Sequence, residues 1–198
     1  MPDILVIKPS SLGDIVHGLQ VIQSLRDQIA GCHISWVVRE CYAPLLHKCG
    51  AIDEVIIYHR YGGWYKFLSL LQKIRERKYD AVIDFQGLAR SGLMTLVSRS
   101  KQKFGRTDAR EFSRWIYSKK APLPESGKYS HALEILLEFL PLLHCEPRLY
   151  SGLKFNKNHS SYIPHQITDN NTLLLFPESQ RSEKEWGRFP YLTFKLLK

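Results

Sequence analysis

The chain has 198 residues, of which 44% are hydrophobic, so it is long enough for one large domain or for a domain and part of another. No stretch approaches the roughly 20 apolar residues that a membrane-spanning helix needs. The start, MPDILVIKPSS, lacks the basic residues and long apolar run of a signal peptide, so we expect a cytoplasmic protein. The four cysteines show no paired spacing, which favours free thiols over a zinc site or disulfides.

The net charge of +9 is concentrated in one segment. Residues 60–128 contain 16 Lys and Arg against 6 Asp and Glu, while the rest of the chain contains 12 against 13. A segment of this kind suits a phosphate-rich partner, such as nucleic acid, anionic lipid headgroups or an acidic glycolipid. The simpler interpretation is a solvated basic surface.

Short apolar strands alternate with amphipathic helices along the first 118 residues. The pattern predicts strands at residues 4–8, 33–38, 54–58, 79–85 and 101–105, and helices at 14–28, 42–48, 64–77, 91–98 and 109–118. This alternation predicts an α/β fold with a parallel, doubly wound, Rossmann-like sheet.

The pattern changes after residue 118. We expect a connection over 119–128, a long apolar helix over 129–143 and a polar linker after it. A strand at 172–176 and a helix opening at Pro190 then restart the α/β pattern. The sequence therefore predicts a Rossmann-like domain over residues 1–155, a linker over 156–171 and the beginning of a second domain over 172–198.

The motif KPSSLGDIVHG, residues 8–18, joins the first strand to its helix. Loops at the carboxyl ends of parallel strands line the ligand crevice of such sheets. Ser10 and Ser11 offer hydroxyls and a candidate N-cap, and Gly13 permits close approach of a ligand to the backbone. The motif is neither a dinucleotide fingerprint nor a Walker A loop.

Asp14, at the start of this helix, has two interpretations. On position alone we favour an acidic residue that complements the helix dipole. The functional alternative is a carboxylate base at the mouth of a cleft, although the helix N-terminus would lower its pKa and weaken it as a base. His17, one turn on, either orients an acceptor or is a histidine satisfied within the fold.

Two further motifs follow later strands of the same sheet. In VIDFQGLARSG, residues 82–92, the side chains of Gln86, Arg90 and Ser91 would reach the same crevice. The alternative is that Asp84 and Gln86 only cap the loop. Arg106 and Arg110 follow the fifth strand and would share one helix face with Arg114; arginine forks bind carboxylate and phosphate. The aromatic residues interleaved with these arginines, at 112, 115 and 117, have a spacing that suits core packing.

The last motif is FPESQRSEKEWGRFP, residues 176–190. Hydroxyl, amide and cationic groups that would suit a diphosphate come together there at Ser179, Gln180, Arg181 and Lys184. Taken in isolation, an ordinary charged surface loop is the favoured interpretation.

Together these motifs resemble one family. The segments ILVIKPSSLGDIVHGLQVIQSLR, YDAVIDFQGLARSGL, HALE and PESQRSEKEW are similar to the ADP-heptose:lipopolysaccharide heptosyltransferases of glycosyltransferase family 9. The opening resembles heptosyltransferase I more than II. The resemblance implies a GT-B fold with two Rossmann-like domains that face each other across a cleft.

The resemblance also implies the chemistry. The family's catalytic aspartate corresponds to Asp14, and its sugar-nucleotide loop corresponds to Ser179, Gln180, Arg181 and Lys184, where Gln180 departs from the usual hydroxyl residue. The resemblance therefore implies an inverting transfer of L-glycero-D-manno-heptose from ADP-heptose to Kdo-lipid A. We expect the acceptor side to comprise Ser10, Ser11, Gly13, His17, Gln86, Arg90, Arg106 and Arg110.

Further expectations concern partners, location and length. We expect no metal or other cofactor, no nucleic-acid partner, and peripheral contact with the cytoplasmic face of the inner membrane. Family members extend over two Rossmann-like domains, so we expect this chain to be a C-terminally truncated fragment with little activity or donor binding by itself. The alternatives are a non-catalytic Rossmann-like module for anionic glycolipid or nucleic acid, and a related glycosyltransferase with another nucleotide-sugar donor.

Overall fold

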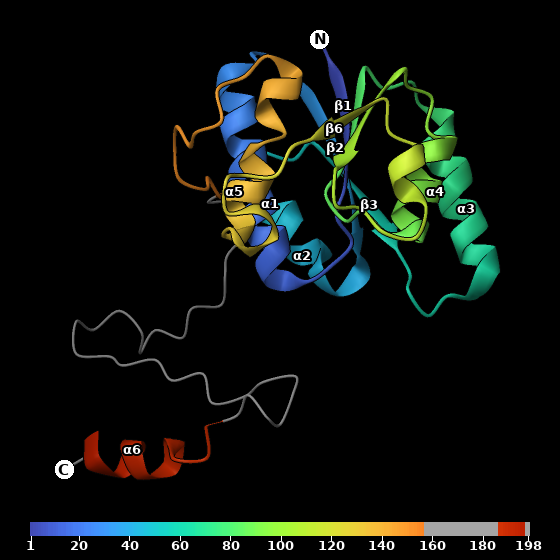
Figure 1. Ribbon diagram of the computed structural model, residues 1–198. Helices are drawn as coiled ribbons and strands as arrows, with labels where there is room; N and C mark the ends of the chain where they lie inside the picture. The colour runs from blue at the N-terminus through green and yellow to red at the C-terminus, as the bar shows by residue number, and fades with distance from the viewer. Residues whose placement is uncertain (157–185, 197–198) are drawn as a thin grey trace. The chain divides into compact units, whose positions relative to one another are not determined.

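The computed structural model describes residues 1–156 and 186–196, and its central feature is a sheet of six parallel strands in the order β3-β2-β1-β4-β5-β6. The chain divides into two compact units, Met1–Asn158 and His159–Lys198, and the sheet belongs to the first. Helices cover both faces of the sheet (Figure 1). This is the doubly wound arrangement that the alternation of strands and helices predicts.

The strands are β1 Asp3–Ile7, β2 His33–Arg39, β3 Glu54–Tyr58, β4 Ala81–Asp84, β5 Gln102–Arg106 and β6 Lys119–Ala121. The helices are α1 Leu12–Gln28, α2 Ala43–Lys48, α3 Gly63–Glu76, α4 Ala89–Val97, α5 Ala132–Leu137 and α6 Phe189–Leu196. Short 3-10 turns occur at Glu40–Tyr42, Ser113–Trp115, Gly127–Tyr129 and Leu140–Leu143. The first five strands and four helices are confirmed to within two residues at each end.

The two faces of the sheet have separate cores. Ile4 and Val6 of β1 pack with α1, α2 and α5 on one face of the sheet. The alternate residues Leu5 and Ile7 pack with Leu70 of α3 on the other face. Successive side chains of a strand point to opposite faces, so a strand buried on both faces is apolar throughout. Figure 1 shows α1 and α5 on one side of the strands and α3 and α4 on the other.

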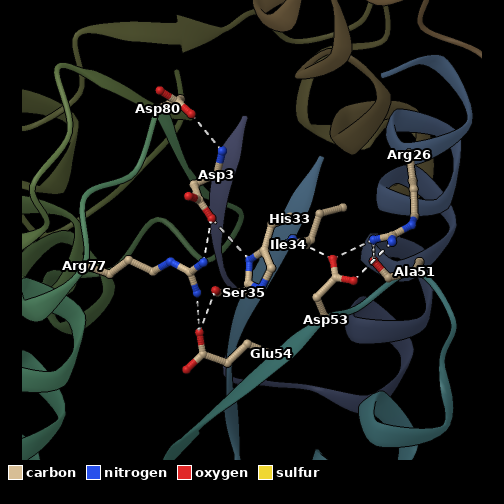
Figure 2. Close-up of polar contacts among 10 residues, drawn as sticks. All are labelled: Asp3, Arg26, His33, Ile34, Ser35, Ala51, Asp53, Glu54, Arg77 and Asp80. Carbon is tan, nitrogen blue, oxygen red and sulfur yellow. Dashed lines mark hydrogen bonds and ion pairs between the residues drawn. The ribbon is translucent and has the colours of Figure 1, made fainter. Parts of the chain in front are cut away.

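A network of charged side chains ties the strands together near their amino-terminal ends (Figure 2). Arg77 reaches Asp3 of β1 at 2.9 Å and Glu54 of β3 at 3.2 Å. Arg26 of α1 pairs with Asp53 at 2.6 Å. Each pair is partly exposed and contributes at most about 1 kcal/mol, so the network adds little to the stability of the fold.

The predicted helix over residues 109–118 is wrong. Only a 3-10 turn at Ser113–Trp115 forms, and the backbone is left-handed at Glu111 (φ 53°) and Phe112 (φ 65°). The segment instead places Tyr117 against Gly105, where a Cβ atom would lie 2.2 Å from the tyrosine ring. The three arginines of this segment therefore share no helix face.

The next two predictions also need correction. The expected connection over residues 119–128 contains a sixth strand, β6, which is short, polar and paired only with β5 among the described strands. The expected helix over 129–143 is broken into α5 and a 3-10 turn. Pro141 lacks an N–H, and in a continuous helix its ring would clash with the carbonyl of Leu137, where α5 ends.

The chain remains attached to the first unit up to the end of the described segment. The N–H of Asn156 donates to the carbonyl of Lys48 at 2.8 Å, and Phe155 bridges to Cys49. In the second unit, α6 begins one residue before Pro190, which lies in its first turn. The predicted strand at 172–176 and the rest of the expected linker lie outside the described residues. Among the helices described, none is both long and apolar enough to cross a membrane.

Candidate functional site

The candidate site lies where the strand order reverses, between β1 and β4. The loops that follow β1, β4 and β5 meet at the carboxyl ends of the strands, which is where open α/β sheets bind ligands. The motifs at residues 8–18 and 82–92 therefore come together at one edge of the sheet, as their positions after strands predict.

Asp14 is held in place through one of its two carboxylate oxygens. Oδ2 accepts hydrogen bonds from the backbone N–H (3.3 Å) and the hydroxyl (3.1 Å) of Ser11, which is the N-cap of α1. The same oxygen lies 3.3 Å from Nζ of Lys8. Oδ1 has no partner among the described residues, and the side chain is 44% exposed. A ligand can thus reach Asp14 without disrupting the helix cap.

Asp14 remains ionised near neutral pH. Burial by itself would raise the pKa of Asp14, but the Lys8 ammonium and the Ser11 hydrogen bonds outweigh burial and lower it. Burial also lowers the pKa of Lys8, against the attraction of Asp14. Lys8 is not among the predicted site residues, although a lysine directly after a buried strand and six residues before Asp14 is a signal that the sequence contains.

Asp84 shapes the loop after β4 from a fully buried position. Its Oδ1 accepts from the N–H groups of Gln86 (2.9 Å) and Gly87 (3.0 Å), and Tyr117 donates its hydroxyl to Oδ2 at 2.8 Å. Burial raises the pKa of Asp84 despite these hydrogen bonds. The capping interpretation is therefore right for Asp84. It does not apply to the side chain of Gln86, whose Oε1 is buried without a partner among the described residues.

A cavity of about 150 Å³, called here the arginine cavity, opens beside this loop. It is lined by Pro9, Ser10, Arg39, Tyr58, Arg60, Gln86, Leu88, Arg90, Ser91 and Met94. The lining contains three arginines and no acidic side chain, so it suits an anionic group. Arg90 donates to the Tyr58 hydroxyl at 2.9 Å, which orients its guanidinium. Arg39 is the last residue of β2 and Arg60 lies two residues after β3; neither is among the predicted site residues.

A second cavity, of about 220 Å³, shares Gln86 and Leu88 with the first. Lys8, Arg106 and Arg110 also line it. Asp108 already holds Arg106 through two hydrogen bonds of 2.8 Å, so much of the charge of Arg106 is compensated within the protein. Arg110 is exposed, and its backbone N–H donates to Gly87 at 2.9 Å.

The other predicted site residues lie in different surroundings. A Cβ at Gly13 would meet nothing within 4 Å, so the position is open. His17 lines neither cavity; its ring stands edge-on to His131, with 5.1 Å between centroids, and its Nδ1 is buried without a partner among the described residues. The four predicted donor residues Ser179, Gln180, Arg181 and Lys184 lie outside the described residues. Within the described part, no group of three or more His, Cys, Asp and Glu side chains is arranged to hold a metal ion.

Comparison with known proteins adds to this geometry. The lipopolysaccharide core heptosyltransferase OpsX of Haemophilus influenzae is 24% identical over 185 residues, which cover 91% of this chain and 52% of that protein. Lipopolysaccharide heptosyltransferase 1 of Salmonella typhimurium is 26% identical and is covered to 61%. The chain therefore spans little more than half the length of these curated relatives.

Solved structures have the same fold. One is E. coli heptosyltransferase WaaC with ADP-2-deoxy-2-fluoro heptose, with a TM-score of 0.66 and 27% identity. The matched region covers 76% of this chain and 51% of the WaaC chain. A glycosyl transferase of family 9 from Veillonella parvula matches with a TM-score of 0.65 at 22% identity, which speaks for the fold alone.

The family model described as glycosyltransferase family 9 (heptosyltransferase) matches residues 67–194, more than half of the chain. The match begins within α3 and extends into α6. The chain therefore belongs to glycosyltransferase family 9, and its described part has the α/β, GT-B-like fold of that family.

Proposed function

We propose that this chain forms the acceptor-binding half of an inverting heptosyltransferase. The enzyme would transfer L-glycero-D-manno-heptose from ADP-heptose to Kdo of the lipopolysaccharide inner core. The observation that carries the proposal is the partly exposed carboxylate of Asp14 at the strand-order switch point, anchored through Oδ2 and without a described partner at Oδ1. The relatives named as lipopolysaccharide heptosyltransferases support the reaction class.

The proposed reaction is a direct displacement. Oδ1 of Asp14 accepts the proton of a Kdo hydroxyl while that oxygen forms a bond to the anomeric carbon of heptose. The bond from this carbon to the diphosphate breaks, and ADP leaves with the bonding electron pair. Because Lys8 and Ser11 lower the pKa of Asp14, the carboxylate is a weak base. The proton therefore moves only as the new bond makes the hydroxyl more acidic.

The two cavities would position the acidic acceptor. Arg39, Arg60 and Arg90 offer guanidinium groups to a carboxylate or phosphate, and Gln86 offers its unpartnered amide oxygen to a sugar hydroxyl. Ser10 lines the same cavity, and Arg110 lines the adjoining one. We place this half of the enzyme at the cytoplasmic face of the inner membrane, where such an acceptor would be presented.

The donor would be bound mainly by the second domain. The WaaC structure with ADP-2-deoxy-2-fluoro heptose supports this donor class. Arg181 and Lys184 would offset the charge of the leaving ADP, and Ser179 and Gln180 would contact it. Because the chain spans little more than half of its relatives, we expect weak or no binding of ADP-heptose by residues 1–198 themselves.

Binding of the acceptor tests the proposal on the chain itself. Calorimetry with Kdo-lipid A in detergent micelles should show binding that Arg90→Gln weakens, while Arg99→Gln, at the opposite edge of the sheet, leaves it unchanged. ADP-heptose should give no measurable heat. Equal binding of Kdo-lipid A by both variants would contradict the assignment of the arginine cavity.

Transfer is tested in a polypeptide that joins residues 1–171 to the donor-binding domain of a heptosyltransferase. We expect Asp14→Asn to lower kcat by about 10²- to 10⁴-fold, the usual contribution of a general base. Full activity of Asp14→Asn would exclude a base at this position. Transfer from another nucleotide sugar in preference to ADP-heptose would assign a different donor to the same fold.

A further inference from the structure

Three large aromatic side chains project together into solvent where α3 begins. Tyr61, Trp64 and Tyr65 are 83%, 61% and 71% exposed, and the rings of Trp64 and Tyr65 stack with centroids 3.6 Å apart. We call these three residues the aromatic tip. Single exposed apolar residues are ordinary, whereas three exposed aromatic side chains within five residues of sequence are typical of an interaction surface.

The exposed apolar character is confined to the beginning of the helix. Beyond Leu68, the exposed residues of α3 are polar or charged: Ser69, Gln72, Lys73, Arg75 and Glu76. The apolar side chains of the later turns, Leu70 and Ile74, are buried in the core between α3, α4 and the sheet. A partner would therefore contact the N-terminal end of α3 and not the later turns of the helix.

The aromatic tip lies beside the proposed acceptor site. A cavity of about 280 Å³ is lined by Trp64 and Phe67 together with Tyr58, Arg60 and Arg90, and these last three also line the arginine cavity. Both surfaces lie at the carboxyl edge of the sheet, because α3 and α4 each begin where a strand has just ended.

The charges around the aromatic tip are basic. Arg60 lies over the ring of Tyr61, 5.8 Å from its centroid, and Lys66 is exposed on the first turn of α3. The nearby acid Glu40 is paired with His59 at 2.5 Å. Tyrosine and tryptophan favour the boundary between lipid headgroups and acyl chains, and basic residues beside them are attracted to anionic lipids.

We propose that the aromatic tip docks this domain on the surface of an anionic phospholipid bilayer. The proposal rests on the proposed function, since a membrane-held glycolipid whose sugars enter the arginine cavity would leave its lipid in the bilayer next to the tip. The rings of Trp64 and Tyr65 enter the headgroup region, while Lys66 meets lipid phosphates.

Vesicle flotation of residues 1–198 tests this docking without any sugar substrate. Vesicles of equal parts phosphatidylcholine and phosphatidylglycerol should bind the chain, and phosphatidylcholine alone should bind it more weakly. The double change Trp64→Ser with Tyr65→Ser should lower the affinity by on the order of tenfold or more. Lys66→Gln should lower it by about fivefold. Leu96→Ser is the matched control, since Leu96 is an exposed apolar residue (54%) near the C-terminal end of α4, whereas the aromatic tip lies at the N-terminal end of α3.

Three outcomes would overturn the proposal. These are no binding to the mixed vesicles, equal binding by the double variant, and loss of a dimer in the double variant on size-exclusion chromatography, which would assign the tip to a second copy of the chain. All the changed side chains are exposed, and circular dichroism checks that the variants fold. Asp14→Asn should bind vesicles normally, so a failure of the proposed transfer and a failure of docking give different results.

Discussion

At the scale of single residues, the two carboxylate oxygens of Asp14 have different surroundings. Oδ2 accepts hydrogen bonds from Ser11 at the N-terminus of α1, and Oδ1 has no partner among the described residues. The two interpretations of Asp14 from the sequence are therefore compatible, because a carboxylate has two oxygens. The Lys8 ammonium lies 3.3 Å from the anchored oxygen and helps to lower the pKa of Asp14.

Replacing Lys8 should make Asp14 a stronger base. In Lys8→Met the buried positive charge is lost, so the ionised form of Asp14 is less stabilised and its pKa rises. Carbon-detected NMR titration of the Asp14 carboxyl measures this directly. Lys154→Met, which removes a cation paired with Asp27, is the control and should leave Asp14 unchanged. An unchanged Asp14 pKa in Lys8→Met would mean that Ser11 alone sets it.

Two glycines of α1 should respond oppositely to alanine. A Cβ at Gly18 would lie 2.9 Å from the buried ring of Trp36, whereas a Cβ at Gly13 would meet nothing within 4 Å. We expect Gly18→Ala to lower the free energy of unfolding by about 1–3 kcal/mol. Gly13→Ala should leave it unchanged or raise it by up to about 1 kcal/mol. Urea denaturation compares the two; equal effects would contradict the contact with Trp36.

At the scale of elements, the segment between β5 and β6 shows where local patterns stop being sufficient. Its spacing favours a helix, yet the chain passes through two left-handed residues and a 3-10 turn. The reason is a contact across 33 residues: Tyr117 turns inward over Gly105 and donates its hydroxyl to buried Asp84. Phe112 and Trp115, which the spacing assigns to the core, are exposed instead.

Removing the Tyr117 hydroxyl should destabilise the protein in a pH-dependent way. Tyr117→Phe removes a hydrogen bond that favours the ionised form of buried Asp84, so its loss should cost about 1–3 kcal/mol at pH values where Asp84 is ionised. Burial already raises the pKa of Asp84 above that of the unfolded chain, so its contribution to stability is present at acidic pH and is lost as pH rises through the folded pKa. The loss in Tyr117→Phe should therefore be smaller in acid.

Urea denaturation of Tyr117→Phe at neutral and acidic pH measures this difference. Trp115→Phe, at an exposed position of the same segment, is the control. It should leave the free energy of unfolding nearly unchanged at both pH values. A loss that is independent of pH would show that Asp84 is not the group that responds.

At the scale of the whole molecule, the first unit contains both cores and every strand that the structure describes. We propose the domain boundary near its end, where Asn156 still bonds to Lys48. The family match nevertheless extends from α3 to α6, across both units. The chain thus combines a sheet domain that has its own cores with a segment that we assign to donor binding.

Residues 1–158 should fold without the rest of the chain. We expect one cooperative urea transition with a midpoint close to that of residues 1–198, because the buried apolar surface of both cores lies within this segment. Circular dichroism and tryptophan fluorescence should report the same transition, since Trp36 is fully buried. A broad or absent transition would show that the later residues are required for folding.

The sequence by itself determined the doubly wound sheet and the edge at which the motifs of residues 8–18 and 82–92 meet. Burial on both faces makes the central strands apolar, and burial on one face makes the helices periodic; this information is local, whereas polar β6 carries no such pattern. Only the tertiary structure decided that Lys8 pairs with Asp14, that Arg39 and Arg60 join Arg90 in one cavity, and that Tyr117 shapes the segment before β6. These contacts join residues from different strand ends, so spacing along the chain does not encode them.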